Sequence, residues 1–223
     1  DENHATRAVN HPEFFHVFSQ IGAKKGFVVM SMWGCGATSI ATIKPFKKLA
    51  DLKGRKIRVL ATPLERAVIG SLGATGVPIP YSEVLPSMQR KTIDGVRSSI
   101  GVMHPSKFWT VAKNITLTGM AQITCGSFTS TAWLNKLPSD LKKIVMDVAK
   151  ASTKHSGKWG YDLTRLAEKR WAEEKGAVVN RLSDAEQKEL ISRVKPIGDK
   201  ILGQDPKTKD IFALLKKVAA VTR

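Results

Sequence analysis

The chain has 223 residues, 42% of them hydrophobic and 25% charged, and a formal net charge of +17. This composition is ordinary for a globular protein, and no apolar run approaches the roughly 20 residues that a membrane-spanning helix needs. The first residues contain neither a basic nor an apolar leader segment, so we expect no signal peptide in this sequence. Three alternatives follow: a cytoplasmic protein, an export signal already removed, or a sequence whose start is missing.

The positive charge is compatible with nucleic acid, an anionic membrane surface or anionic small molecules as partners. Basic residues are spread along the chain, and the densest stretch runs from Lys44 to Arg58. No helix-turn-helix, zinc-finger or RNA-binding signature accompanies them. A nucleic-acid-binding protein is therefore retained only as an alternative.

The two cysteines, Cys35 and Cys125, are 90 positions apart. This spacing is typical neither of a disulfide framework nor of a zinc site. Both cysteines lie near expected strands, so we predict small buried hydrophobic side chains rather than reactive thiols. Cysteine usage then leaves the cellular compartment open.

The first part of the chain favours helices, then strands and helices in alternation. The expected elements, in order, are a helix over 4–24 broken at Pro12, strands at 27–33 and 40–43, a strand at 56–60, a helix over 63–72, an edge strand at 77–80, a helix capped by Ser82 and a strand at 92–96. The alternation between residues 49 and 96 predicts an α/β fold with parallel strands and crossover helices.

The second part is dominated by one long helix. Strands are expected at 115–118 and 123–131, followed by 36 residues (140–175) without proline that have apolar residues at helical spacing. Such a helix is longer than one α/β domain of this size needs, which favours a brace across two lobes. A short strand at 178–179, a capping box at 183–186 and terminal helices broken at Pro196 and Pro206 complete the prediction.

The sequence lacks the patterns of catalytic and cofactor chemistry. The run Gly34-Cys-Gly36-Ala-Thr-Ser39 lacks the third glycine and the following helix of a dinucleotide fingerprint. The five histidines are scattered, and only Glu65, Glu83 and Asp94 supply carboxylates between residues 61 and 138. We therefore expect a protein that is not an enzyme and has no cofactor and no metal.

Four short motifs follow one another: Asp51-Leu-Lys-Gly-Arg-Lys-Ile-Arg58-Val, Leu72-Gly-Ala, Val77-Pro-Ile-Pro-Tyr-Ser-Glu-Val84 and Ile93-Asp-Gly95. With their spacings, they resemble the solute-binding subunits of tripartite ATP-independent periplasmic (TRAP) transporters, the dicarboxylate-binding DctP-like family. The resemblance implies a two-lobed α/β periplasmic-binding-protein fold with a long bracing helix (about 140–175) across both lobes. Lobe one would comprise 1–35 and 124–163, and lobe two 36–123 and 164–223, with the family's N-terminal third lacking.

The resemblance also implies a site. Arg58 matches the arginine that salt-bridges the ligand carboxylate in the family, and a guanidinium suits this role because it can donate two parallel hydrogen bonds; a structural ion pair or a solvated arginine is the alternative. Tyr81 aligns with an aromatic residue that stacks on the ligand in some members, or it is a core aromatic. Three departures are Thr38, where many members have a second arginine, Ser98, where they have an asparagine, and Arg97, which replaces a glutamate.

These features predict an extracytoplasmic receptor that binds a small organic acid and delivers it to a TRAP membrane permease. The departures favour a monocarboxylate as the ligand, including an aromatic one, over a C4-dicarboxylate. Trp33 is a further ligand-binding candidate, with a core position as its alternative. We expect a periplasmic monomer. A sensor's ligand-binding domain of the same fold is the runner-up.

Overall fold

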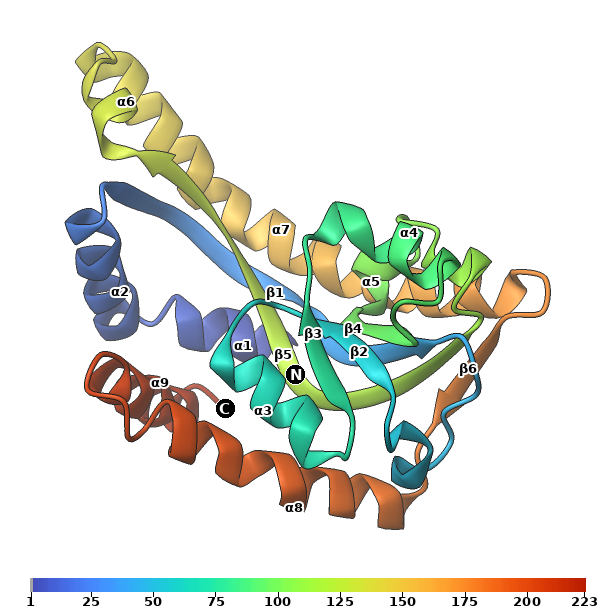
Figure 1. Cartoon of the computed structure of the whole chain (residues 1–223). Coiled ribbons are helices and arrows are strands. Elements are labelled where there is room, and N and C mark those ends of the chain that lie inside the picture. The colour runs from blue at the N-terminus through green and yellow to red at the C-terminus, as the bar shows by residue number, and fades with distance from the viewer. Residues whose placement is uncertain (1) are drawn as a thin grey trace. The chain divides into compact units, whose positions relative to one another are not determined.

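The computed structural model describes residues 2–223, and the chain divides into two compact units (Figure 1). Unit 1 comprises Asp1–Gly36, Gln122–Asp162 and Pro206–Arg223, and unit 2 comprises Ala37–Ala121 and Leu163–Asp205. Each unit is thus assembled from segments that are distant in the sequence.

Helices and strands alternate along most of the chain. The α-helices are α1 (Glu2–Val9), α2 (Pro12–Lys24), α3 (Pro63–Ser71), α4 (Val84–Gln89), α5 (Ile100–Met103), α6 (Thr131–Asn135), α7 (Ser139–Glu173), α8 (Asp184–Ile201) and α9 (Lys209–Val221). The strands are β1 (Phe27–Thr42), β2 (Lys56–Val59), β3 (Thr75–Pro78), β4 (Gly95–Ser99), β5 (Asn114–Ser130) and β6 (Val178–Arg181). Short 3-10 turns cover Leu49–Leu52, Tyr81–Glu83 and Phe108–Thr110.

The strands form a mixed sheet in the order β3-β2-β4-β1-β5-β6. β2 runs parallel to β3 and β4, β5 runs parallel to β6, and β1 is antiparallel to β4. The proline-rich strand β3 lies at the edge as predicted, because proline cannot donate a hydrogen bond to a further strand. The parallel part confirms the predicted α/β class.

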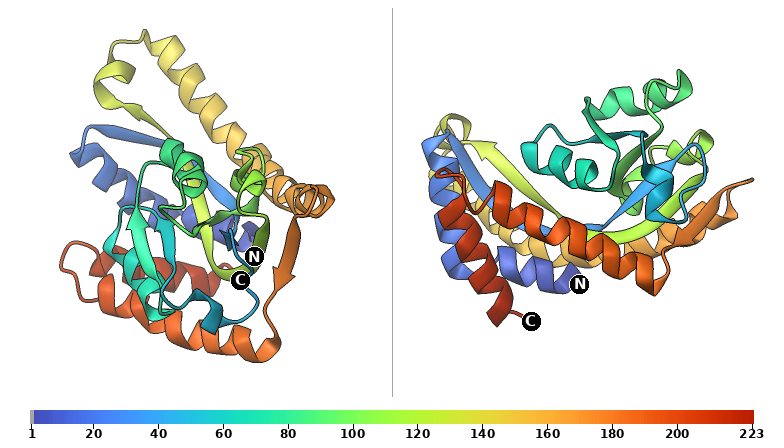
Figure 2. Two further views of the ribbon diagram at one scale, coloured as in Figure 1. Left: turned by 45° about the vertical axis from the view of Figure 1, so that its right-hand side comes forward. Right: turned by 60° about the horizontal axis from the view of Figure 1, so that its bottom comes forward.

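In unit 2 both faces of the sheet are covered. One face packs Ile40 and Ile57 against α3 and α8, which run alongside each other (Figure 2). The other face packs Ala41 and Val96 against α4, α5 and the C-terminal part of α7, where Trp171 is fully buried. A sheet buried on both faces holds its strands rigidly, which fixes the side chains that project from strand ends.

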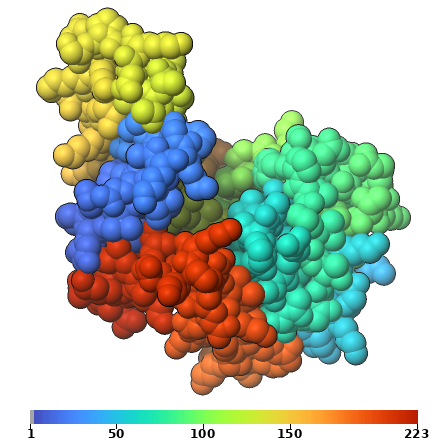
Figure 3. Space-filling view, turned by 60° about the vertical axis from the view of Figure 1, so that its left-hand side comes forward, coloured from blue at the N-terminus to red at the C-terminus, as the bar shows by residue number. Residues whose placement is uncertain are grey.

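Unit 1 has a smaller core, formed where α9 packs on α1 and α2 (Figure 3). Its buried residues include Phe14 from α2, Val29 and Met32 from β1, and Val218 from α9. Cys35 of β1 and Cys125 of β5 are joined by a disulfide, with their Cα atoms 6.0 Å apart. The expectation of two free cysteines was wrong, because β1 and β5 are sheet neighbours and bring distant positions together.

Several predicted boundaries also change. The strands expected at 27–33 and 40–43 are one strand, β1, and those expected at 115–118 and 123–131 are one strand, β5. Helix α8 continues through Pro196 instead of ending there, and Ser82 lies in a 3-10 turn before α4 rather than capping it. The long helix predicted over 140–175 is α7, and its residues are divided between the two units.

The division into units differs from the expected lobes at the C-terminus. Residues 206–223 were assigned to lobe two but belong to unit 1. The reason is the apolar face of α9, which supplies Val218 and its neighbours Leu214 and Leu215 to the core of unit 1. The sequence shows that the helix is amphipathic but not which unit its apolar face covers, and the packing decides this.

Candidate functional site

Arg58 lies on β2, one residue before that strand ends, between the parallel strands β3 and β4. Its register partners are Val77 on β3 and Val96 on β4, so its side chain shares the sheet face that α4 and α5 cover. Ligands of open α/β sheets bind near the carboxyl ends of the strands. Arg58 is therefore positioned where this architecture places binding residues.

The guanidinium of Arg58 is buried, and residues 2–223 supply no acidic partner for it. The residue is 5% exposed, and Nε donates a hydrogen bond to the carbonyl oxygen of Ile79 at 3.1 Å. Among the described residues, no carboxylate forms an ion pair with it. Burial lowers the pKa of Arg58, while its interactions with Tyr81 and Glu65 act in the opposite direction. A buried cation without a counter-ion is costly, so this position suits an anion supplied from outside the chain.

Tyr81 lies beside Arg58. The guanidinium carbon lies 5.6 Å from the centre of the Tyr81 ring, which also contacts Phe108. The phenol oxygen lies 2.8 Å from Ser106 Oγ and 3.1 Å from the carbonyl oxygen of Val102. Burial raises the pKa of Tyr81, and the Ser106 hydrogen bond and Arg58 oppose that rise. The ring, 37% exposed, is thus fixed beside Arg58 with one surface open.

Ser98 shares the sheet face of Arg58. It lies two residues beyond Val96 on β4 and pairs with Ser39 on β1, and side chains two apart on a strand point the same way. Ser39 is buried and Ser98 is half-buried. The sheet therefore presents one guanidinium and two small hydroxyl side chains on this face, a set suited to a carboxylate and neighbouring hydroxyl groups.

Arg97 has a different environment. Its register partner is Ile40, which belongs to the core under α3 and α8, so it projects from the opposite face to Arg58. Its Nη1 is bonded to the carboxylate of Glu65 on α3, and both side chains are largely buried. The extra cation expected in the pocket is therefore already neutralised within unit 2.

Thr38 also lies on the face of Arg97, paired with Ser99. Its Oγ1 accepts a hydrogen bond from the backbone of Ala121 at 3.2 Å. Thr38 helps to line a cavity of about 320 Å³ whose wall includes Gln187 and the ion pair of Arg181 with Glu168. Thr38 is thus separated from Arg58 by the sheet.

Trp33 belongs to unit 1, whereas the other five candidates belong to unit 2. It is half-buried on β1, and its indole nitrogen is buried without a hydrogen-bond partner. Unit 1 has its own cavity of about 700 Å³ between α2, β1 and α7, and Trp33 does not line it. Phe15, His16 and Lys150 do.

The site contains residues that sequence reasoning missed. Glu65 was counted only as one of few carboxylates, yet it decides the state of Arg97. The sequence could have indicated part of its position. Thr62 caps α3 and accepts a hydrogen bond from the Glu65 amide, which places Glu65 in the first helical turn. The pairing with Arg97, 32 residues away, required the fold.

The described part of the chain offers no group of three or more His, Cys, Asp or Glu side chains arranged to hold a metal ion. Within residues 2–223, no helix is both long and apolar enough to cross a membrane. The arrangement around Arg58 combines a buried cation, an aromatic ring and hydroxyl groups.

Comparison with known proteins gives consistent matches. Residues 1–205 match the family model described as bacterial extracellular solute-binding protein, family 7 (DctP). The C4-dicarboxylate-binding periplasmic protein DctP of Vibrio cholerae is 26% identical over 200 residues, which cover 88% of this chain and 57% of that protein. The chain spans about half the length of the curated relatives it matches.

Solved structures share the fold. A TRAP periplasmic solute-binding protein from Shewanella oneidensis with bound succinate matches with a TM-score of 0.86 and 24% identity, over 97% of this chain and 70% of that one. The periplasmic ectoine-binding protein of the TeaABC TRAP transporter of Halomonas elongata matches with a TM-score of 0.85 and 22% identity, with the same coverage.

Proposed function

Because the chain belongs to family 7 of the bacterial extracellular solute-binding proteins, we propose that it binds a small organic acid through Arg58 and delivers it to a TRAP membrane permease. The observation that carries this proposal is the buried guanidinium of Arg58 without an acidic partner in the described chain. Its remaining donors can form two parallel hydrogen bonds to one carboxylate. Tyr81 and Ser98 would contact the rest of the ligand.

The ligands of similar proteins support the chemical class. The Shewanella protein holds succinate and the Halomonas protein binds ectoine, and both compounds carry a carboxylate. A solved relative from Desulfovibrio desulfuricans instead holds sn-glycerol-3-phosphate, which a guanidinium can also bind in a bidentate manner. An anionic group is common to all three ligands, so we place the anion on Arg58.

The disulfide supports an extracytoplasmic location. Disulfides persist in oxidising compartments such as the bacterial periplasm and are rare in the cytosol. Cys35 and Cys125 are bonded to each other, and no free cysteine remains. We therefore propose that the protein acts in the periplasm, and that thiol alkylation before reduction will leave both cysteines unmodified in protein prepared from cells.

Ligand binding is tested by a thermal-shift screen of the 223-residue protein against organic acids, followed by calorimetric titration of the hits. A ligand at a hundred times its dissociation constant stabilises the folded state by about 2.7 kcal/mol. Arg58→Ala should weaken binding about a hundredfold or more, because it removes charged hydrogen bonds. Arg66→Ala, an exposed arginine on α3, is the matched control and should bind normally.

Two results would contradict the proposal. One is a hit that binds Arg58→Ala as tightly as the unaltered protein, which would remove Arg58 from the site. The other is the absence of a shift with every acid tested while the protein remains folded.

A further inference from the structure

In unit 2, the parallel strands begin and β1 ends along one edge of the sheet, perpendicular to the strands. Backbone hydrogen bonds follow this edge: the Thr75 amide donates to Arg55, the Asp94 amide to Lys56, the Ile43 amide to Asp94 and the Val178 amide to Lys113. The side chain of Asn114 also donates to the Ile43 carbonyl at 3.3 Å. Loops distant in the sequence therefore meet at this edge, opposite the strand ends near Arg58.

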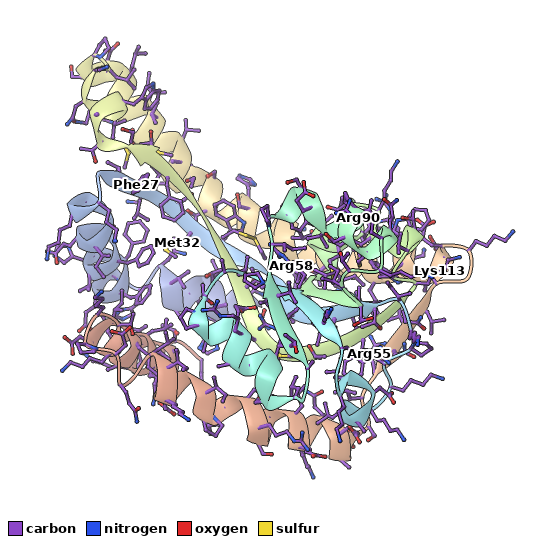
Figure 4. The ribbon with its side chains drawn as sticks, in the orientation of Figure 1. Phe27, Met32, Arg55, Arg58, Arg90 and Lys113 are labelled. Atoms are coloured by element: carbon purple, nitrogen blue, oxygen red, sulfur yellow. A yellow bond between two sulfur atoms is a disulfide. The ribbon has the colours of Figure 1, made fainter. Side chains whose placement is uncertain are left out.

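Basic residues are concentrated there, and we call this set the lysine rim. Its members are Lys44, Lys47, Lys48, Lys53, Arg55, Lys56, Arg90, Lys91, Lys113 and Lys175. All are exposed except Arg55, which is half-buried. Arg55, Arg90 and Lys113 are labelled in Figure 4, all farther to the right than Arg58. Glu173 and Glu174 directly precede Lys175, whereas the stretches 43–56 and 90–95, which carry eight of the ten members, contain only two acidic residues, Asp51 and Asp94.

The carboxylates of Asp51 and Asp94 accept hydrogen bonds from backbone amides. Asp51 Oδ2 accepts hydrogen bonds from the amides of Lys47 and Lys48 at 2.8 and 3.0 Å. Asp94 Oδ2 accepts from the amide of Lys56 at 2.8 Å. Within residues 2–223, no member of the rim forms an ion pair with a carboxylate. Two members donate hydrogen bonds to backbone carbonyl oxygens, Arg55 to those of Lys44 and Pro45 and Lys113 to that of Lys175. The other eight members are exposed, so most of the positive charge of the rim faces solvent.

The make-up of the rim indicates what it fits. Eight of its ten members are lysines, which are depleted at protein–protein interfaces and act as flexible point charges rather than geometric forks. None of the large hydrophobic residues that are exposed in the structure lies in these stretches. Such a surface suits a partner that presents many phosphate groups close together and does not require each of them to be bound in a fixed orientation.

We propose that the lysine rim binds the surface of an anionic lipid bilayer. Each lysine that approaches such a surface strengthens binding about fivefold, so ten together can hold a protein reversibly at a membrane. The disulfide favours an oxidising compartment, where nucleic acid is not the expected polyanion. The proposal does not depend on Arg58, because the rim lies at the other edge of the sheet.

The test is co-sedimentation of the 223-residue protein with vesicles of phosphatidylcholine alone and of phosphatidylcholine mixed with phosphatidylglycerol. We expect binding only to the mixed vesicles, with release at high salt. The triple variant Lys47→Glu, Lys48→Glu, Lys53→Glu should bind about a hundredfold more weakly or worse. The control variant Lys188→Glu, Lys195→Glu, Lys200→Glu changes three exposed lysines of α8 and the net charge equally, and should bind almost normally.

Four outcomes would overturn the proposal. Equal binding to phosphatidylcholine alone, or no binding to either vesicle, excludes anionic lipid recognition. An equal loss in both variants assigns binding to net charge and not to the rim. Tighter binding to duplex DNA than to the mixed vesicles at equal phosphate concentration, lost in the rim variant alone, makes nucleic acid the partner.

Discussion

Arg58 and Arg97 lie on neighbouring strands of one sheet, and both are almost fully buried, 5% and 7% exposed. Arg97 is paired with Glu65 inside the protein. Among the described residues, the polar contacts of Arg58 are with the carbonyl oxygen of Ile79 and the ring of Tyr81. The same residue type at the same depth can therefore serve stability in one case and remain available to a ligand in the other.

The difference arises from the two faces of the sheet. The face of Arg97 carries α3, whose first turn supplies a carboxylate. The face of Arg58 is bordered by the Tyr81 turn, and Glu65 acts on Arg58 only electrostatically. Removing one partner of a buried ion pair greatly lowers the free energy of unfolding, because the other charge stays buried and unpaired. Removing a buried cation that has no partner lowers it little. Mutations should separate these cases clearly.

The largest effect is expected from Glu65→Ala, which leaves Arg97 buried and uncompensated. The free energy of unfolding should fall by about 3–5 kcal/mol, measured by urea denaturation. The double variant Glu65→Leu, Arg97→Met should recover most of this loss because no charge remains buried. A loss below about 1 kcal/mol for Glu65→Ala would show that the pair is effectively solvated.

Arg58→Met should have the opposite profile. Removing an unpaired buried charge offsets the lost hydrogen bond to Ile79, so the free energy of unfolding should stay within about 1 kcal/mol of the unaltered protein. Ligand affinity should nevertheless fall about a hundredfold or more. A destabilisation as large as that of Glu65→Ala would instead give Arg58 a structural role.

Tyr81→Phe should produce a smaller change, because it removes the hydroxyl contacts with Ser106 and Val102 but keeps the ring beside Arg58. We expect a loss of about 0.5–1.5 kcal/mol in the free energy of unfolding. Ligand affinity should change less than in Arg58→Met. Tyr81→Ala, which removes the ring as well, would weaken affinity further if the ring contacts the ligand.

The smallest effect concerns alkaline pH. The raised pKa of Tyr81 means that the folded protein holds this proton after the unfolded chain has released it, at about pH 10. Stability should therefore decline as the pH rises from the unfolded pKa towards the folded one. The decline should be shallower in Tyr81→Phe, measured as the difference between the two proteins across that range. Equal slopes would contradict the assignment.

Local patterns predicted most elements of the fold. The proline-rich edge strand, the capping serine at position 183 and the long helix α7 all follow from short-range rules. The failures have a common cause. The low helix propensity of proline predicts an end of the helix at Pro196. Instead α8 continues, because Leu190 and Val194 pack in the core beside the sheet. The strands expected as separate pairs are each one continuous strand, β1 and β5, and these two strands are neighbours in the sheet.

The sequence by itself determined the α/β class, the family motifs and the position of Arg58 on a strand. Tertiary structure decided which charges are neutralised: it paired Arg97 with Glu65 and, within residues 2–223, left Arg58 without a carboxylate partner. It also joined Cys35 to Cys125 and gathered dispersed lysines at one edge. The physical reason is range. Propensities, caps and periodicity act within a few residues, whereas ion pairs, disulfides and surface charge depend on distances that only the packed sheet creates.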